Sequence, residues 1–470
     1  MNQATIAALQ AGATLITASQ RLARHLAAGY GATQQAQGAS VWEAPDILPW
    51  NQWLERFWQE SFGLLDADTP QLLLSDFQEQ TLWEEVIRAA DSEPLLQVPA
   101  AARSAREAWQ LLHAWKLSIP RSRESASEDV GAFARWAKTY GQRCTGGNWL
   151  DSARLPEAVR NAIAAGRLAP SRSLIIAGFD ELTPQQDALL NAVRATGVTV
   201  TPLVPGDETA RVARVGYDDR RAEIHVAAAW ARAALESGQT RIGVVVPDLS
   251  VQRSTIVRLF DEALLPAALL PGADIVRPYN VSLGEPLAAW PVIHAALLLL
   301  EFGTGSLPVA RLGTLLRSPF LAGAVSEAST RAQLDALLRQ EGEETVSISA
   351  LLRRANAELA KPQAVVPQLY AQLRAWRDSI PARSTRLAPS AWSEKFAALL
   401  KLAGWPGDGK LDSDSHQAVM AWRELLAAFA AQDVVSTRIN YAEALATLRR
   451  MAGERVFQPQ TPAAPVQVLG

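Results

Sequence analysis

The sequence predicts an α/β protein with two parallel-sheet domains, each interrupted by an all-helical insert. Short apolar runs bounded by turn residues open directly into amphipathic helices, which is the basic step of an α/β sheet. The long segments between these stretches show helical periodicity and no strand pattern. The length of 470 residues agrees with more than one domain, because a chain of this size exceeds a single hydrophobic core.

The first α/β stretch opens with a β-rich run, Ala13–Thr17. Ser19 then leads into an amphipathic helix, and Gly29 is expected to end that helix. A second extended piece at residues 41–49 precedes a tryptophan-rich helix at 50–58. Because tryptophan buries a large area, the tryptophans in such helical patterns are expected in the core.

The segment 63–167 is expected to be an all-helical insert, and a capping box lies near its start at Ser75–Gln78. The α/β pattern then returns with an apolar run, Ser173–Asp180, whose brevity favours a buried parallel strand. The pair Thr183–Pro184 predicts the start of a helix. A further strand is expected at 198–204.

The second α/β stretch alternates between strands and helices. The expected order is a strand at 212–217, a helix at 221–235, a buried strand at 241–247 and a helix at 251–264. The pattern then becomes helical, and the last residues, Pro465–Gly470, have the pattern of a strand. Since a domain rarely stops at such a point, we expect the natural protein to continue. The predicted boundaries are 1–62 and 168–208 for the first α/β domain, 63–167 for its insert, 209–283 and 462–470 for the second, incomplete α/β domain, and 284–461 for the second insert.

Composition excludes several kinds of site. The single cysteine, Cys144, lies in an expected flexible loop and excludes an internal disulfide or a cysteine zinc cluster. Five histidines spread along the chain make a histidine metal site unexpected, so we predict no metal. The net charge of −3 lacks the basic excess of a dedicated nucleic-acid binder, and DNA binding would need a local basic groove.

Nothing in the sequence indicates a membrane protein. The N-terminus lacks the basic region and the long apolar run of a signal peptide. The longest apolar stretch, Pro286–Phe302, is short for a membrane span and is expected to be a buried helix. We therefore expect a cytoplasmic protein without a membrane partner.

One motif resembles a nucleotide-binding loop. Gly404–Lys410 fits a phosphate loop as far as its lysine, but Leu411 replaces the serine or threonine that holds Mg²⁺. A helix precedes it where a strand is needed, so a turn between two helices is the favoured interpretation. The sequence also lacks the Gly-x-Ser-x-Gly turn of a serine nucleophile. We therefore predict no cofactor and no catalytic residue.

Candidate ligand contacts follow the predicted strands. Thr17, Ser19 and Arg21 could contact a phosphodiester at a helix N-terminus, although Ser19 could equally be a plain N-cap. Asp180 ends a buried strand, where acids often face a ligand; the alternative is a loop that caps the next helix. Arg253 lies near the first turn of a later helix and could instead be a solvated arginine.

The order of these elements resembles superfamily 1 helicases of the UvrD and RecB type. It is most similar to the AddB branch of helicase–nuclease subunits, and to bacterial DNA-repair proteins that carry a C-terminal RecB-like nuclease domain. The segments that carry the resemblance are Thr14–Ala23, Ile175–Thr183, Glu223 with Ile242–Asp248, and Leu283–Phe320. Together they span most of the chain.

The resemblance implies two RecA-like domains that bind DNA in a groove between them. In active relatives the segment matching Thr14–Ala23 touches single-stranded DNA, which adds Gln20 to Thr17, Ser19 and Arg21. The phosphate loop and the acidic Mg²⁺ pair of active helicases are missing, and the nuclease residues would lie beyond Gly470. The implied role is a motor-dead module of double-strand break processing.

The expected partners are DNA, as single strands or duplex ends, and a helicase–nuclease partner subunit. Two alternatives stay open. One is a protein-interaction scaffold that holds a nuclease domain or a partner, which the slightly acidic net charge favours. The other is an ATP-hydrolysing enzyme that uses Gly404–Lys410.

Overall fold

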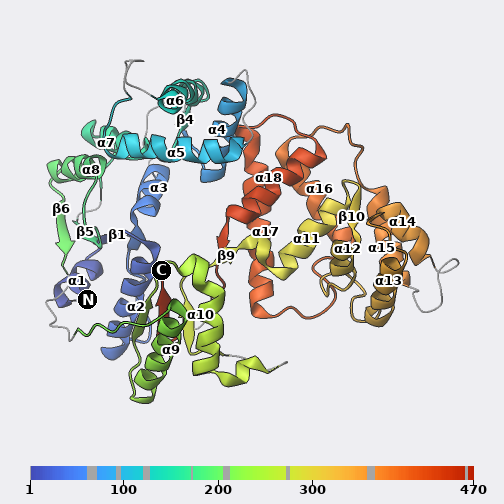
Figure 1. The fold of residues 1–470 in the computed structure, drawn as a ribbon. Coiled ribbons are helices and arrows are strands. Elements are labelled where there is room, and N and C mark those ends of the chain that lie inside the picture. The colour runs from blue at the N-terminus through green and yellow to red at the C-terminus, as the bar shows by residue number, and fades with distance from the viewer. Residues whose placement is uncertain are drawn as a thin grey trace. The chain divides into compact units, whose positions relative to one another are not determined.

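The computed structural model describes most of the chain as two compact units. The described residues are 2–60, 71–90, 97–119, 127–170, 173–204, 212–270, 276–356, 366–460 and 464–470. Unit 1 is Met1–Ala210 and unit 2 is Arg211–Gly470. The described elements are mostly helical with several small, mainly parallel sheets, so the chain belongs to the α/β class (Figure 1).

Unit 1 contains a four-stranded sheet in the order β2-β1-β5-β6, in which every pair is parallel. The strands are β1 Thr14–Thr17, β2 Ile47–Pro49, β5 Ser173–Ala177 and β6 Thr199–Leu203. The chain passes from β1 to β2 on one side and later returns to β5 on the other side of β1. The strand order therefore reverses between β1 and β5.

Helices cover both faces of this sheet. Because successive strand residues point to opposite faces, neighbouring residues of β1 pack against different helices. Leu15 faces the cluster formed with α1 (Gln3–Gln10) and α2 (Gln20–Ala36). Its neighbour Ile16 faces the cluster formed with three other helices. These helices are α3 Trp50–Glu60, α7 Leu155–Ala164 and α8 Pro184–Ala195. Figure 1 shows α7 and α8 together near β5 and β6.

Between α3 and α7 the described residues form a helical segment with a small sheet. Its elements are β3 Leu72–Leu73, α4 Asp76–Ala90, α5 Val98–Ala114, α6 Glu128–Gly146 and β4 Trp149–Leu150. The buried Trp83 of α4 stacks on Tyr140 of α6 with ring centroids 4.1 Å apart, as expected for a core tryptophan. The parallel pairing of β3 with β4 corrects the prediction of an all-helical insert. Runs of two residues give no periodic pattern from which the sequence could have shown them.

Unit 2 contains a three-stranded parallel sheet in the order β7-β13-β8. The strands are β7 Ile242–Val245, β8 Tyr279–Val281 and β13 Val466–Leu469. The last strand of the chain is thus the central strand of this sheet, with α9 (Arg220–Glu236) and α10 (Leu249–Leu264) packed into its core.

The rest of unit 2 is mainly helical and also contains short strands, which again corrects the expectation of an all-helical insert. Its helices are α11 Pro291–Phe302, α12 Val309–Leu316, α13 Ala328–Gln340, α14 Ile348–Ala355, α15 Pro367–Asp378, α16 Pro389–Leu402, α17 Ser413–Ala430 and α18 Tyr441–Glu454, with 3-10 turns η2 Pro266–Leu269, η3 Leu287–Ala289 and η5 Ala431–Val434. Its strands form two antiparallel pairs, β9 Glu285–Pro286 with β12 Val456–Phe457, and β10 Ser306–Pro308 with β11 Thr345–Ser347.

Other local predictions were wrong. Residues 212–217 form no strand, and Val212 is 91% exposed. A β-rich composition is therefore insufficient to form a strand where no neighbouring strand pairs with it. The predicted buried strand at 241–247 is an edge strand in which Val245 is exposed. Gly29 does not end its helix, because α2 continues to Ala36. Cys144 lies buried within α6, not in a loop.

Candidate functional site

The carboxyl edge of the unit 1 sheet, where its parallel strands end, brings two predicted contact segments together. Thr17 is paired with Ala177 across β1 and β5. The Ala18 N–H then donates to the Ala177 carbonyl at 3.0 Å, which places the β1–α2 turn beside the β5–α8 turn. Since the strand order reverses between these strands, this is the place where open α/β sheets bind ligands.

Hydrogen bonds fix the β1–α2 turn. The Thr17 hydroxyl donates to the Ser19 carbonyl at 2.9 Å, and the Ser19 hydroxyl accepts from the Leu22 N–H at 3.3 Å. Ser19 is therefore the N-cap of α2, which confirms that interpretation. Thr17 is fully buried, so its hydroxyl positions the turn, whereas Ser19, Gln20 and Arg21 are exposed.

The N-terminal half of α2 carries cations where helix electrostatics favour acids. Arg21 and Arg24 are exposed, and the first turn of α2 contains no acidic residue. The partial positive charge of a helix N-terminus falls off within the first turn, so it makes the Arg21 cation unfavourable by about 0.3–1 kcal/mol. A helix N-terminus can bind an anion, and Arg21 adds a positive side chain to this one.

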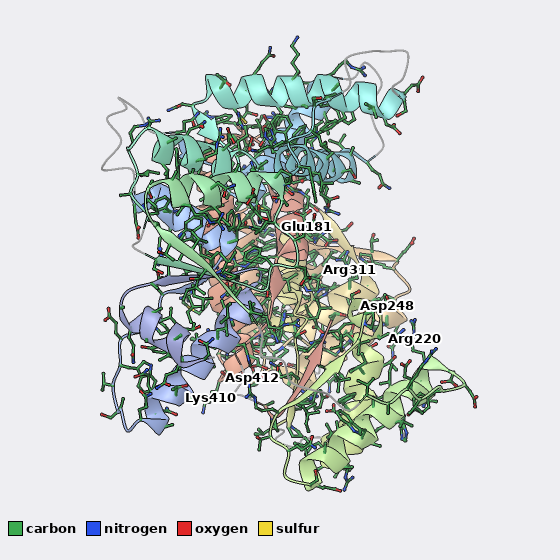
Figure 2. The ribbon with its side chains drawn as sticks, turned by 90° about the vertical axis from the view of Figure 1, so that its left-hand side faces the viewer. Glu181, Arg220, Asp248, Arg311, Lys410 and Asp412 are labelled. Atoms are coloured by element: carbon green, nitrogen blue, oxygen red, sulfur yellow. The ribbon has the colours of Figure 1, made fainter. Side chains whose placement is uncertain are left out.

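The β5–α8 turn approaches α2 through a glycine. Gly178 has φ +74°, and a Cβ on it would lie 2.4 Å from Cδ2 of Leu22. Only glycine fits this backbone conformation and this approach. Asp180 and Glu181, which follow in the same turn, are exposed (Glu181 is labelled in Figure 2).

Thr183, not Asp180, caps the next helix. The Thr183 hydroxyl accepts from the Gln186 N–H at 3.3 Å, and the Gln186 side chain accepts from the Thr183 N–H at 2.9 Å. This capping box leaves Asp180 without a role at the start of α8. In the same turn, the half-buried Phe179 contacts the buried Trp50 edge to face, with ring centroids 6.1 Å apart.

Arg253, the predicted contact in unit 2, is bound within that unit. Its Nε donates to the Leu283 carbonyl at 3.2 Å, and its guanidinium also pairs with Glu285. Arg253 therefore ties α10 to the chain that leaves β8. Nearby, Arg220 and Asp248 form an exposed ion pair at 3.1 Å across the N-terminal ends of α9 and α10 (Figure 2).

The segment Gly404–Lys410 lies between α16 and α17, as a turn between helices. A Cβ on Gly404 would lie 2.2 Å from Cβ of Ala322, and one on Gly407 would lie 2.5 Å from the Pro319 carbonyl oxygen. These glycines therefore allow close packing against residues 319–322. Packing accounts for them without any phosphate.

Sequence reasoning missed a buried polar cluster in the helical segment of unit 1. The fully buried Asp151 accepts from Trp109 Nε1 at 3.3 Å and from Arg154 Nε at 2.8 Å. Glu79 accepts from the Ser152 N–H at 2.6 Å, and burial raises the pKa of Glu79 to about 7. Both carboxylates are enclosed by their partners, so the cluster holds α4, α5 and the turn after β4 together. These partners lie too far apart in sequence to form a motif.

Cys144 shows no sign of an activated nucleophile. Burial raises the pKa of its thiol to about 11, which keeps the thiol protonated at neutral pH. Among the described residues, no group of three or more His, Cys, Asp or Glu side chains could hold a metal ion. None of the helices in the described part of the chain has the length and apolar character that a membrane crossing requires.

Comparison with known proteins adds no family to this description. The chain matches neither any protein-family model nor any curated protein.

Proposed function

We propose that this chain is a helicase-like DNA-binding module of a DNA-repair protein, and that unit 1 contacts single-stranded DNA at the carboxyl edge of its sheet. The observation that carries this proposal is the position of α2. Its exposed, cation-bearing N-terminus lies at the point where the strand order reverses between β1 and β5. A doubly wound parallel sheet with a helical segment after β2 also supports a RecA-like domain with an insert.

The phosphates lie over the first turns of α2. Backbone N–H groups after the Ser19 cap and the side chains of Arg21 and Arg24 supply the donors and the positive charge. Such contacts carry no sequence information and release counterions. Binding therefore weakens with salt, by about 0.7 in log affinity per log unit of salt for each phosphate contact on a single strand.

The acidic β5–α8 turn sets the orientation of the bound DNA strand. Asp180 and Glu181 are exposed on the turn beside α2 and repel phosphates. The bases of the DNA strand therefore face this turn, and the phosphates face α2. The half-buried ring of Phe179 offers an apolar contact in the same turn.

The proposal assigns no ATP hydrolysis to this edge. The β1–α2 turn, Thr17–Gln20, contains neither the glycines that let phosphates approach backbone amides nor a lysine. DNA binding at this edge should therefore be independent of ATP.

Fluorescence anisotropy of a labelled oligothymidine tests the proposal, at about 50 and about 200 mM salt and with and without ATP. We expect salt-sensitive, ATP-independent binding that Arg21→Glu weakens about tenfold, since charge reversal replaces an attraction by a repulsion. Arg167→Glu is the matched control, because Arg167 is an exposed arginine before the opposite end of β5. Equal losses in both variants, or no binding at low salt, would overturn the assignment.

A protein-interaction scaffold is the second candidate, and one surface favours it. Leu111, Trp115 and Leu117, at and just beyond the C-terminal end of α5, are 58%, 41% and 62% exposed. Exposed apolar side chains that cluster in this way often mark contacts with another protein. If this surface joins two copies of the chain, sedimentation velocity shows concentration-dependent association, which Leu117→Ser reduces without changing DNA binding.

A further inference from the structure

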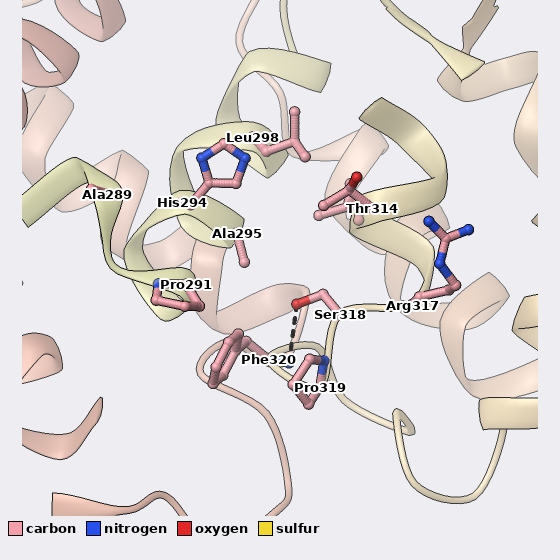
Figure 3. Close-up of a pocket in the computed structure, with 11 residues that line it drawn as sticks. Ala289, Pro291, His294, Ala295, Leu298, Thr314, Arg317, Ser318, Pro319 and Phe320 are labelled. Carbon is pink, nitrogen blue, oxygen red and sulfur yellow. Dashed lines mark hydrogen bonds between the residues drawn. The ribbon is translucent and has the colours of Figure 1, made fainter. Parts of the chain in front are cut away.

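A cavity in unit 2 lies between the N-terminal half of α11 and the C-terminal end of α12 (Figure 3). Its volume is about 430 Å³, and its apolar walls include Pro291, Leu298 and Phe320. This volume falls within the range of sites for small organic ligands, roughly 300–1,000 Å³. The cavity is formed by residues of unit 2 alone.

The turn that follows α12 is held in place by the turn between α16 and α17. Gly404 and Gly407 pack against residues 319–322, and the Asp408 carboxylate accepts from the Gly323 N–H at 3.1 Å. Trp405, in the turn between α16 and α17, donates from Nε1 to the Val292 carbonyl of α11 at 2.8 Å. Both walls of the cavity are therefore fixed before any ligand arrives.

Neutral groups that form hydrogen bonds line the cavity. The Ser318 hydroxyl oxygen accepts from the Phe320 N–H at 3.2 Å and keeps its own O–H to donate. The exposed Thr314 hydroxyl donates to the Ala310 carbonyl at 3.2 Å and keeps its lone pairs to accept. The exposed imidazole of His294 adds two ring nitrogens that can form hydrogen bonds. Figure 3 shows these side chains around one cavity.

The charge beside the cavity is positive. Arg317 lines it and pairs with Asp335, but Asp335 also pairs with Arg339 at 3.1 Å. One carboxylate thus faces two guanidinium groups, and one positive charge is left over. Arginine beside an apolar slot with neutral donors and acceptors is the chemistry that recognises a heteroaromatic base linked to a phosphate.

We propose that this cavity binds a nucleotide, with the base against Phe320 and Pro291 and the phosphate near Arg317. The proposal rests on the proposed function, because the nucleotide can be one unit of the bound single-stranded DNA. A free mononucleotide has the same chemistry, and the test separates these two sources.

The first arm of the test compares a labelled oligodeoxyadenosine with the same oligonucleotide made abasic at its central positions, by anisotropy with the full chain. A base held in the cavity makes the intact strand bind at least about fivefold more tightly, the lower end of base–aromatic stacking. The second arm titrates deoxyadenosine monophosphate calorimetrically. Binding in this arm shows that a free nucleotide also enters the cavity.

Two variants connect either signal to the cavity. Ala289→Trp fills the mouth from an exposed position, and Thr314→Val removes an acceptor with little change in shape. Thr304→Val is the matched control, since Thr304 is exposed near the end of α11 and its hydroxyl donates to the Glu301 carbonyl at 2.8 Å. Circular dichroism and thermal unfolding establish that each variant is folded.

We expect Ala289→Trp and Thr314→Val to reduce the preference for intact bases, and Thr304→Val to keep it at the wild-type value. The proposal is overturned if intact and abasic strands bind equally and the mononucleotide does not bind. It is also overturned if the two cavity variants keep the wild-type preference. Arg21→Glu distinguishes a failure of the cavity proposal from a failure of the proposed function. If the proposed function holds, this variant weakens the binding of intact and abasic strands alike.

Discussion

Glu79 and Ser152 are joined across 73 residues of the chain. Glu79 accepts from the Ser152 backbone N–H at 2.6 Å with one carboxylate oxygen and from the Ser152 hydroxyl at 3.2 Å with the other. The Arg106 Nε lies 3.3 Å from the same carboxylate. These hydrogen bonds fix the turn after β4 to α4. The Glu79 side chain that makes them is only 2% exposed.

The first prediction concerns pH. Burial raises the pKa of Glu79 from 4.5 to about 7, so folding favours its protonated form. The resulting stability is fully present below about pH 4.5 and is lost as the pH rises through 7. The shift corresponds to about 3 kcal/mol in the free energy of unfolding. Glu79→Gln, which imitates the protonated form, should therefore be more stable than wild type at pH 8 and similar at pH 5.

Urea unfolding followed by tryptophan fluorescence from pH 5 to 8 measures this difference. Glu107→Gln on α5 makes the same substitution at an exposed position and serves as the control. A difference between Glu79→Gln and wild type that stays constant over this range would contradict the prediction.

The second prediction concerns Asp261, which is buried at the end of α10. Its carboxylate accepts from Arg277 Nε at 2.9 Å, from Arg277 Nη2 at 3.0 Å and from the Tyr279 hydroxyl at 2.7 Å. Removing one partner of a buried pair costs about 3–5 kcal/mol, and the partial exposure of Arg277 reduces this to about 2–3 kcal/mol. Asp261→Ala should lower the free energy of unfolding by that amount. Glu262→Ala, which breaks the exposed pair with Arg258, should change it by less than about 1 kcal/mol.

Both variants can be compared by chemical denaturation at neutral pH. If they were equally stable, Asp261 would not hold β8 against α10. Tyr279→Phe provides an intermediate case, since it removes the hydroxyl that is shared between Asp261 and the Val257 carbonyl, worth about 1 kcal/mol, and leaves the arginine pair intact.

The third prediction separates two glycines of the turn after α16. Gly407 has φ +97° and its space is filled by Pro319, whereas a Cβ on Gly409 would meet nothing within 4 Å. Gly407→Ala should therefore lower the free energy of unfolding by about 2 kcal/mol or more, and Gly409→Ala by less than about 0.5 kcal/mol. Thermal unfolding of the two variants is the measurement. Equal effects would show that packing does not explain the glycine at position 407.

The fourth prediction concerns ATP. Lys410 lies in a turn between α16 and α17, without the strand that a phosphate loop requires (Figure 2). Lys410→Ala should therefore leave calorimetric titrations with Mg²⁺-ATP unchanged from wild type. A loss of nucleotide binding in this variant would instead support the ATP-hydrolysing alternative.

The fifth prediction concerns the acids beside α2. Because Asp180 and Glu181 repel phosphates, the double substitution Asp180→Asn with Glu181→Gln should tighten oligothymidine binding about three- to tenfold at low salt. The gain should shrink at higher salt, because exposed charges are screened within about 10 Å at 0.1 M. The anisotropy assay at two salt concentrations measures both effects. Weaker binding on neutralisation would place the acids in direct contact with donor groups of the DNA.

The sequence by itself determined the features that depend on neighbouring residues. Local patterns of capping, apolar runs and turn residues predict the Ser19 and Thr183 caps, the strand that ends at Thr17 and the helix–helix turn at Gly404. They also predict a strand from Ser173, although it ends at Ala177 and not at the expected Asp180. The α/β class follows from the same patterns, because a buried strand that opens into a capped helix has few alternative folds.

Only the tertiary structure decided which of these segments meet. Pairing of β1 with β5 puts the Ser19 turn beside the Asp180 turn, and the same fold buries Thr17 and binds Arg253 to Glu285. Residues 212–217 show the reverse case, where a strand-like composition forms no strand because a β-strand exists only with a partner. Hydrogen bonds and packing between distant segments set these outcomes, and local sequence patterns do not predict such contacts.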